Sequence, residues 1–420
     1  MGEQGRSRVA EAPSRSLEVE GTLPTVRVRS PGWHPLIFKK MVIGPEPGPR
    51  PSDGDLVRVV DRDGVPLGFG LWNGKSQIPV RLIVRGERPP GSEFWEGRID
   101  EAVSLRRETL GLDSVSDAYR LVHAEGDGLS GLVVDRFGEV LSAEVFSLGI
   151  YQRIGPLMDR LREKAGASAY RVHVDHRIAQ AEEFSGRPVA TEGAPEKVEI
   201  REHGVRYRVR FEGGHKTGFF CDQRDNRKEL ARYCQGRSVL DVCCYSGGFG
   251  LSALVNGGAK EVSAVDLDEK AVAMARENAN LNQVRMNLVH ADAFGYMRQM
   301  GVNRRRFGVV VLDPPKLIGS RREMDEGRKK YLDLNTLAMG LVEPGGLLLT
   351  CSCSGLLPVE EFSGILRSAG RRAGRSARLL AMTGAAPDHP VGLEAPEGAY
   401  LKAAWLVLGE ESKRDQGEDS

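Results

Sequence analysis

The chain has 420 residues, and its 59 lysines and arginines almost balance its 58 aspartates and glutamates, leaving a formal net charge of +1. This charge excludes nucleic-acid binding through a global positive field, so any RNA contact must come from local basic patches. The length is typical of two or three domains, and 40% hydrophobic with 28% charged residues describe a soluble globular protein. No apolar run is long enough to span a bilayer and no apolar signal core opens the sequence. We therefore expect a cytoplasmic protein without a membrane partner.

Six cysteines occur, all in the second half of the chain, and none of them forms a CxxC pair. They are Cys221, Cys234, Cys243, Cys244, Cys351 and Cys353. This spacing argues against a zinc knuckle and against a disulfide framework. We therefore expect neither a bound metal nor structural disulfides.

The residue composition and the apolar–polar pattern of the N-terminal part of the chain change near Pro24. Residues 1–23 are rich in Glu, Arg, Ser and Gly without a period, which predicts a disordered extension. Apolar and polar residues then alternate at 25–29, 55–60 and 78–85, as is typical of strands. The pattern predicts a small β-barrel over residues 24–90 with arginines on its exposed face. An ordinary barrel with solvated arginines and an RNA-binding barrel both fit it.

The rest of the chain divides into two further regions. Residues 91–212 mix helical and strand patterns, including a helix predicted from Phe94 to Leu110, and form an α+β middle domain without catalytic residues. Strands and helices alternate over residues 213–409, which predicts the α/β fold class with a doubly wound, Rossmann-like sheet. The charged tail, residues 410–420, is expected to be loose.

A glycine turn lies at the centre of the third region. The buried strand Val239–Val242 leads into Ser246-Gly247-Gly248, and a helix is predicted from Gly250 onward. Paired glycines let the backbone bend sharply and approach a ligand without a Cβ in the way. A strand, a glycine turn and a helix form the cradle of a nucleotide-type cofactor, although the spacing is not the dinucleotide pattern G-x-G-x-x-G.

Carboxylates follow the next two strands. The strand 261–266 ends in Asp266, at about the spacing expected for an acid that binds ribose hydroxyls. Asp268 is a predicted N-cap for a helix over 269–280, and the short strand 286–290 is followed by Asp292. Two strand ends with aspartates indicate a site for a nucleoside without phosphates. S-adenosylmethionine fits that site better than NAD does.

Two later strand ends carry residues that suit chemistry on a base. One is Asp313-Pro314-Pro315-Lys316, where the prolines stiffen a loop between an acid and a cation. The other carries Cys353, whose thiolate could add to carbon 6 of a pyrimidine and so make carbon 5 nucleophilic. A small buried apolar role is the alternative for any cysteine and is preferred for Cys243 and Cys244. Cys351 is expected on the opposite side of its strand end from Cys353.

Several motifs in the same order then identify a family. They are the glycine turn, Asp313-Pro314-Pro315-Lys316, Ser352-Cys353-Ser354-Gly355, the loop Gly214-His215-Lys216-Thr217-Gly218-Phe219-Phe220 with Asp222-Gln223-Arg224, Tyr119-Arg120-Leu121, Asp127-Gly128-Leu129, Asp135-Arg136-Phe137-Gly138 and Asp388-His389-Pro390. From about Pro24 to Leu408 the chain resembles the bacterial 23S ribosomal RNA cytosine-carbon-5 methyltransferases. These are class I S-adenosylmethionine enzymes with an N-terminal PUA barrel. The resemblance implies a large-subunit ribosomal RNA partner.

The resemblance also implies roles for single residues. Cys353 would be the nucleophile, Asp313 would hydrogen-bond the target base, and Lys316 would contact phosphate or base. Asp266 would bind the ribose and Asp292 the adenine amine. The other implied cofactor contacts are Thr217, Phe219, Gln223, Tyr245, Ser246, Gly247, Gly248, Leu267, Ala293 and Asp313. The loop from Lys216 to Arg224 would close over the cofactor.

The sequence departs from the family at Leu36, where the barrel usually has an aromatic residue after His-Pro, and over 173–183. The candidate RNA contacts are basic clusters of the third region, which could equally be solvated faces. They are Arg304-Arg305-Arg306, Arg321, Arg322 and Arg328 to Lys330. Two other functions stay open: methylation of another atom, such as uracil carbon 5 or a guanine nitrogen, and a non-catalytic RNA-binding assembly factor. A homodimer is one option for the assembly.

Overall fold

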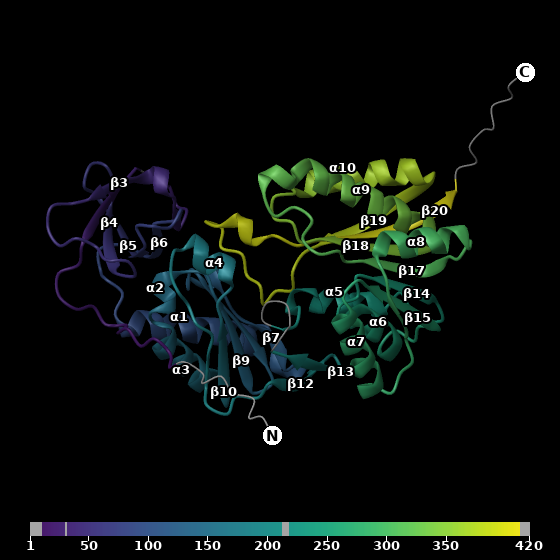
Figure 1. Ribbon diagram of the computed structural model, residues 1–420, viewed down its shortest axis with the longest axis horizontal. Coiled ribbons are helices and arrows are strands. Elements are labelled where there is room, and N and C mark those ends of the chain that lie inside the picture. The colour runs from purple at the N-terminus through teal and green to yellow at the C-terminus, as the bar shows by residue number, and fades with distance from the viewer. Residues whose placement is uncertain (1–10, 30–31, 212–217, 412–420) are drawn as a thin grey trace, which may run out of the picture. The chain divides into compact units, whose positions relative to one another are not determined.

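The computed structural model describes residues 11–29, 32–211 and 218–411 (Figure 1). Its contacts divide the chain into two units. Unit 1 comprises Met1–Ile200, Val209–Cys221 and Pro387–Gly398, and unit 2 comprises Arg201–Arg208, Asp222–Ala386 and Ala399–Ser420. A two-stranded sheet of β12 (Lys197–Glu202) and β13 (Val205–Arg210) lies where the chain passes between them. Within the described ranges, no helix is both long and apolar enough to cross a membrane.

The first sheet of unit 1 has six strands in the order β2-β6-β5-β4-β1-β3. They are β1 (Thr25–Val28), β2 (Leu36–Ile37), β3 (Val42–Pro45), β4 (Leu56–Val60), β5 (Pro66–Trp72) and β6 (Val80–Arg85). The predicted alternation is confirmed in β4, where Val57 and Val59 are buried and Arg58 is exposed. β1 runs parallel to β4, whereas the other neighbouring pairs run antiparallel.

The stretch before this sheet differs from the predicted disordered extension over its described residues. Leu17 is buried in the same apolar cluster as Trp95, and the backbone N–H of Arg15 donates to the carbonyl oxygen of Gln152. The few apolar residues of this stretch follow neither a strand nor a helix period, so the burial of Leu17 could not be predicted from the sequence. Residues 1–10 of that prediction lie outside the described ranges.

The second sheet of unit 1 has the order β11-β10-β9-β8-β7. The strands are β7 (Ala118–His123), β8 (Leu132–Phe137), β9 (Val140–Val145), β10 (Ala169–His173) and β11 (Val189–Ala190). The helices of this region are α1 (Ser92–Ser104), α2 (Leu148–Tyr151), α3 (Ile154–Ala165) and α4 (His176–Ala181). The predicted helix from Phe94 to Leu110 corresponds to α1 and a π-helical turn, Leu105–Thr109, that follows it. Ile99 and Val103 are buried in the cluster that covers this sheet.

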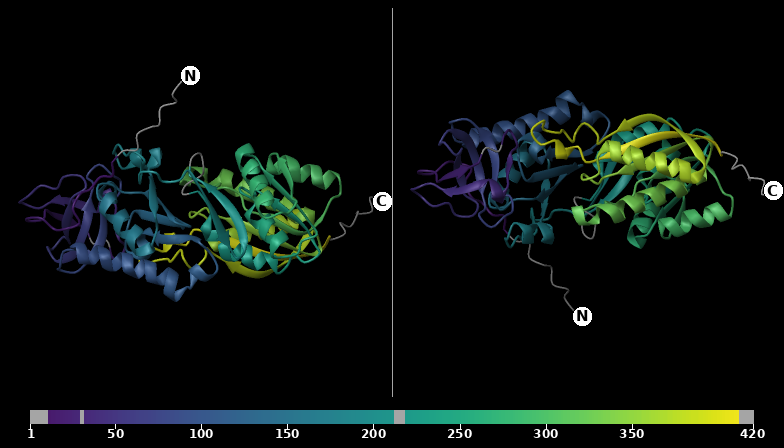
Figure 2. Two further views of the ribbon diagram at one scale, coloured as in Figure 1. Left: turned by 90° about the horizontal axis from the view of Figure 1, so that it is seen from below. Right: turned by 90° about the horizontal axis from the view of Figure 1, so that it is seen from above.

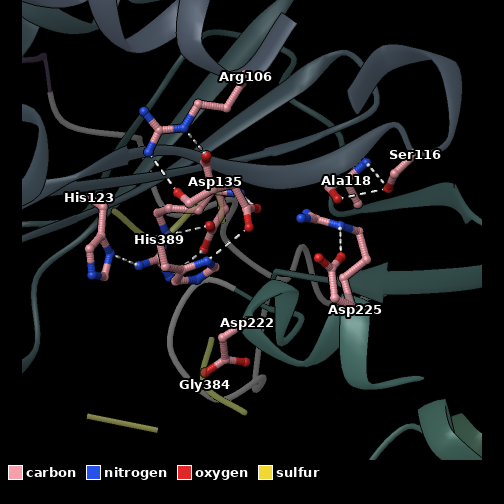
Figure 3. A network of polar contacts seen from close by, with 12 residues as sticks. Arg106, Ser116, Ala118, His123, Asp135, Asp222, Asp225, Gly384 and His389 are labelled. Carbon is pink, nitrogen blue, oxygen red and sulfur yellow. Dashed lines mark hydrogen bonds and ion pairs between the residues drawn. The ribbon is translucent and has the colours of Figure 1, made fainter. Parts of the chain in front are cut away.

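A network of buried charges joins β7 to residues 387–398 within unit 1 (Figure 3). Arg106 donates to Asp127 Oδ1 at 2.5 Å and to the carbonyl oxygen of Asp388 at 2.6 Å. The backbone N–H of Arg120 donates to Asp388 Oδ2 at 2.8 Å. Burial, Arg120, His389 and Arg106 together lower the pKa of His123 to about 2, so this imidazole is neutral at neutral pH. The Asp388-His389-Pro390 motif thus anchors a late segment of the chain in the first unit.

Unit 2 is built on a seven-stranded sheet in the order β16-β15-β14-β17-β18-β20-β19. The strands are β14 (Ser238–Val242), β15 (Glu261–Asp266), β16 (Asn287–His290), β17 (Phe307–Leu312), β18 (Val342–Ser352), β19 (Arg375–Thr383) and β20 (Lys402–Glu411). The helices are α5 (Arg224–Ala231), α6 (Gly248–Val255), α7 (Glu269–Leu281), α8 (Ala293–Val302), α9 (Met324–Leu341) and α10 (Val359–Ala373). The first five strands in this order are parallel, and β20 is antiparallel to both of its neighbours.

Helices cover both faces of this sheet. Figure 1 shows α8, α9 and α10 on one face and α5, α6 and α7 on the other, and the right-hand view of Figure 2 looks onto α9 and α10. Alternate residues of β17 accordingly belong to two clusters, with Val310 and Leu312 in one and Val309 and Val311 in the other. The predicted doubly wound sheet is confirmed.

We predict that Arg106→Met destabilises unit 1 by about 3–5 kcal/mol, because it leaves the buried carboxylate of Asp127 without its cation. Native-state amide exchange in β7 and β8 measures this loss. The matched control is Arg162→Met, which removes an exposed pair with Asp159 and should cost less than about 1 kcal/mol. Equal protection in Arg106→Met and wild type would contradict the prediction.

Candidate active site

The register of the parallel strands brings four strand ends to one edge of the sheet. Val242 pairs with Val265 of β15 and with Leu312 of β17, and Leu312 pairs with Thr350 of β18. The residues that directly follow this row are Cys243, Asp266, Asp313 and Cys351. Ligands of open α/β sheets bind beyond the carboxyl ends of the strands, so these residues mark the candidate site.

The glycine turn between β14 and α6 has the backbone conformation that its sequence predicts. Gly247 has a φ of 81°, and a Cβ added there would lie 3.0 Å from the Met286 side chain. Tyr245 also has a positive φ, 48°, a conformation that costs a non-glycine residue of order 1 kcal/mol. Asn278 Nδ2 donates to the Ser246 carbonyl oxygen at 3.1 Å and holds the turn from α7. The turn is therefore fixed before any ligand arrives.

Asp266 is oriented by two backbone donors. Its Oδ2 accepts from the N–H of Tyr245 and its Oδ1 from the N–H of Asp268, both at 2.9 Å. The next residue, Leu267, is 68% exposed, which gives this strand end an apolar surface beside a carboxylate. Asp292 is the N-cap of α8 and accepts from the N–H of Gly295 at 2.7 Å. Asp268 likewise caps α7, as the sequence predicted.

Asp313 is half-buried at the end of β17 and has a perturbed acidity. Burial and the charges of Asp222 and Asp241 raise the pKa of Asp313 to about 7. Gln223 Nε2 donates to Asp313 Oδ2 at 3.1 Å, and this bond opposes the rise. Near neutral pH, Asp313 can therefore act as either a hydrogen-bond donor or an acceptor.

Asp241 is a further acid of this region that the sequence analysis did not single out. It is fully buried in β14, and its Oδ2 accepts from the N–H of Gly250 at 2.9 Å. Its Oδ1 makes no hydrogen bond to the described residues. Burial raises the pKa of Asp241 to about 7, and the charge of Asp266 also raises it. The signal in the sequence that could have identified Asp241 was an aspartate inside an apolar strand shortly before a glycine turn.

Cys353 lies in the loop after β18 and is half-buried. Polar contacts on both sides fix this loop. Tyr331 of α9 accepts a hydrogen bond from Ser352 Oγ at 2.9 Å, and its hydroxyl lies 3.0 Å from Ser354 Oγ. The N–H of Ile318, from the loop after β17, donates to Ser354 Oγ at 3.1 Å. The loops that carry Asp313 and Cys353 are thus tied together.

The expectation that Cys351 lies on the opposite side from Cys353 is wrong. Cys351 is fully buried in the cluster against which Cys353 also packs. The two are separated by two positions, and side chains at i and i+2 of an extended segment point to the same face. Cys351 is more deeply buried than Cys353, and this burial raises the pKa of Cys351 well above its ordinary value. Burial also raises the pKa of Cys243 and of Cys244, as suits the apolar role predicted for them.

The remaining predicted site residues fall into three groups. Tyr245, in the turn after β14, and Ala293, the first residue of α8, are half-buried, and Lys316 is exposed after the two prolines. Phe219 is buried but belongs by its contacts to unit 1. Thr217 and Lys216 lie outside the described residues.

Unit 1 has an exposed aromatic surface that the sequence analysis missed. Trp33 is 71% exposed, Phe38 is 41% exposed, and the Arg85 guanidinium lies 4.8 Å from the Trp33 ring centre. Leu36, which replaces the expected aromatic residue, is half-buried in β2. The available signal was Trp33 itself, which stands directly before His-Pro rather than after it.

Comparisons with known proteins add to this geometry. A family model described as S-adenosylmethionine-dependent methyltransferase matches residues 155–375, and one described as PUA-like domain matches residues 32–85. A relative named ribosomal RNA large subunit methyltransferase I, from Aeromonas hydrophila, is 38% identical over 376 residues, or 88% of this chain and 94% of the relative. The protein of the same name from Shewanella amazonensis is 38% identical over 380 residues, with the same shares. The chain belongs to this methyltransferase family.

Solved structures agree on the fold of the methyltransferase. A protein from Streptococcus mutans described as a SAM-dependent methyltransferase superimposes with a TM-score of 0.76 at 20% identity, over 92% of this chain and all of that one. A methyltransferase structure in complex with SAH gives a TM-score of 0.77 at the same identity and coverage. The predicted PUA-like domain, methyltransferase fold and S-adenosylmethionine cofactor are therefore confirmed.

The chemistry of the site fits S-adenosylmethionine. This cofactor carries a sulfonium and an ammonium cation, a carboxylate and no phosphate, whereas acids stand at or directly after three strand ends, at Asp266, Asp292 and Asp313. Such a set would repel a pyrophosphate and attract a cation. Asp266 and the exposed Leu267 suit a ribose hydroxyl pair and an adenine face. The described residues contain no cluster of three or more side chains able to hold a metal ion.

We predict that Asp266→Asn weakens binding of S-adenosylmethionine by about 10- to 100-fold, the value of one or two hydrogen bonds to a charged acceptor. Titration calorimetry measures the dissociation constant. Glu269→Gln is the control. It removes a neighbouring exposed carboxylate in the first helical turn of α7 and leaves the glycine turn between β14 and α6 unchanged. Equal affinities in the two variants would contradict the assignment.

Proposed function

We propose that this methyltransferase forms 5-methylcytosine in large-subunit ribosomal RNA, with Cys353 as the nucleophile. One observation carries the proposal: a half-buried thiol and an acid of raised pKa stand on tied loops at the ends of adjacent strands. The relatives' name, which specifies large-subunit ribosomal RNA, supports the substrate class. We also propose that Asp266, Asp292 and the glycine turn bind the cofactor.

The proposed chemistry begins on the pyrimidine ring. The Cys353 thiolate adds to carbon 6, forming a carbon–sulfur bond, while the protonated Asp313 gives its proton to ring nitrogen 3. The displaced electron pair then makes carbon 5 nucleophilic. S-adenosylmethionine, when bound, supplies the electrophilic methyl group. Removal of the carbon-5 proton by a base afterwards restores the double bond, expels the thiolate and lets nitrogen 3 return its proton to Asp313.

A duplex would hide carbon 6, so the target base has to leave its stack. The loop after β17 offers cations for the flanking RNA. Arg321 and Arg322 are exposed and have no ion pair among the residues that the structure describes. Arg328, in contrast, is paired with Asp325 and Glu361, and Lys330 with Glu326. We therefore propose Arg321 and Arg322, together with Trp33 of the PUA-like domain, as RNA contacts.

The first experiment is methyl transfer from labelled S-adenosylmethionine to unmodified large-subunit ribosomal RNA, followed by digestion to nucleosides. We expect label in 5-methylcytosine with the wild type and none with Cys353→Ala, because no thiolate can activate carbon 5. Cys234→Ala, which removes another buried thiol of unit 2 on the amino-terminal side of β14, is the matched control. Label in 5-methyluracil or a methylguanine would overturn the product, and activity retained in Cys353→Ala would overturn the nucleophile.

Absence of label on naked RNA would move the same assay to assembled subunits. A protein that binds RNA and S-adenosylmethionine yet methylates neither substrate would act as an assembly factor instead. The boundaries of the barrel at residue 90 and of the middle domain at residue 212, and a homodimeric assembly, stay predictions.

Asp313 leads to a pH prediction. Its raised pKa keeps it protonated up to about pH 7, so proton donation weakens as the pH rises through that value. We expect kcat/KM of the wild type to show a descending limb near pH 7. Asp313→Asn should be slower and lack this limb, because an amide does not titrate. A limb that persists in Asp313→Asn would assign the ionisation to another group.

We predict that Arg321→Gln with Arg322→Gln weakens RNA binding and reduces its dependence on salt by about one unit of slope per lost phosphate contact, without changing cofactor affinity. Filter binding over a range of salt concentrations measures both quantities. The control is Lys270→Gln with Arg276→Gln, two exposed cations of α7. Unchanged RNA affinity would exclude the Arg321–Arg322 patch.

A further inference from the structure

Lys402 is a buried cation beside the loop that carries Cys353. It is the first residue of β20, is 3% exposed, and pairs across the sheet with Ser352 of β18. Its Nζ donates to the carbonyl oxygen of Ser354 at 2.6 Å and to that of Tyr400 at 2.8 Å. The ammonium group therefore contacts the residue that directly follows Cys353.

The ammonium has no carboxylate partner in the part of the chain that the structure describes. Lysine is almost never fully buried without an anion, because two neutral carbonyls do not recover the free energy of hydration that the ammonium group loses. Two of its three N–H groups are used by these carbonyls. A group that becomes negative nearby would therefore stabilise the charged lysine, and the lysine would stabilise that group.

Cys353 is the titratable residue directly before Ser354, whose carbonyl oxygen Lys402 contacts, and it is therefore the candidate for that group. Burial lowers the pKa of Lys402 to about 8, the charge of Cys353 raises it, and the charge of Lys316 lowers it. Coupling between two titrating sites is reciprocal, so a cation stabilised by the thiolate lowers the pKa of the thiol in turn. Lys316 is exposed, which screens its effect on the pair.

We propose that Lys402 is the positioning residue that keeps Cys353 in its thiolate form and fixes the Ser354 backbone beside it. This inference rests on the proposed function of Cys353. Tyr331 has a different part: its hydroxyl bonds Ser352 and Ser354 and shapes the loop without supplying charge. The lysine thus combines a geometric contact with an electrostatic one, and only the second depends on its charge.

The test is the pH dependence of Cys353 alkylation by iodoacetamide, followed by mass spectrometry of its peptide, in the full chain without cofactor or RNA. We expect the wild-type thiol to titrate below about 8.5, the ordinary value for cysteine. In Lys402→Met the titration should move up by about 1–3 units, since an opposite charge has been removed, while Lys402→Arg should keep most of the shift. Lys228→Met, which removes an exposed cation of α5, should match the wild type.

Two results would overturn the inference. A wild-type Cys353 that titrates at or above about 8.5 would do so without any variant, even if Lys402→Met failed to fold. Superimposable profiles of folded Lys402→Met and wild type would do so as well, with circular dichroism and cofactor calorimetry showing that the variant is folded.

Other outcomes would test the proposed function independently of the role of Lys402. A shifted thiol in a protein that forms no 5-methylcytosine would leave the lysine–thiol coupling standing and remove its catalytic meaning. Cys353-dependent 5-methylcytosine with an unshifted thiol would remove the role of Lys402 alone.

Discussion

The register of the parallel strands in unit 2 is the constraint on which the site depends. Backbone hydrogen bonds align Val242, Val265, Leu312 and Thr350 in one row, so whatever follows them meets at one edge. A shift of one residue would turn every side chain of a strand to the other face. Both faces of these strands are buried under helices, and such a shift would expose or overpack two cores at once. Apolar packing far from the chemistry therefore fixes where the acids and the thiol stand.

The same burial determines the acidity of the site. Asp241 and Asp313 both have their pKa raised to about 7, mainly because their surroundings exclude water. Each pKa rise is partly opposed by one hydrogen bond, from a backbone N–H or an amide, and by the charge of Arg227. Such groups destabilise the folded protein when they ionise, a cost typical of functional sites.

How much could be predicted from the sequence depended on the range of the interaction. The glycine turn, the Asp268 cap, the strand that ends in Asp266 and the strand that precedes Asp313 follow from local pattern, and the structure has them as predicted. The burial of Leu17 and the anchoring of Asp388 in unit 1 depend on contacts hundreds of residues away or on single side chains, which leave no periodic signal. The side of Cys351 was accessible to a simple strand rule and was nevertheless predicted wrongly.

Lys402 illustrates why a site residue can be invisible in the sequence. In a parallel sheet, the last residue of each strand lies at the end of the sheet where ligands bind. Ligand contacts are therefore expected at the carboxyl ends of the strands. β20 runs antiparallel to β18, and its first residue therefore reaches that edge, opposite Ser352. A lysine before an apolar strand looks like an ordinary solvated charge. Only the reversal of one strand, which the sequence pattern does not encode, turns it into a buried cation beside a candidate nucleophile.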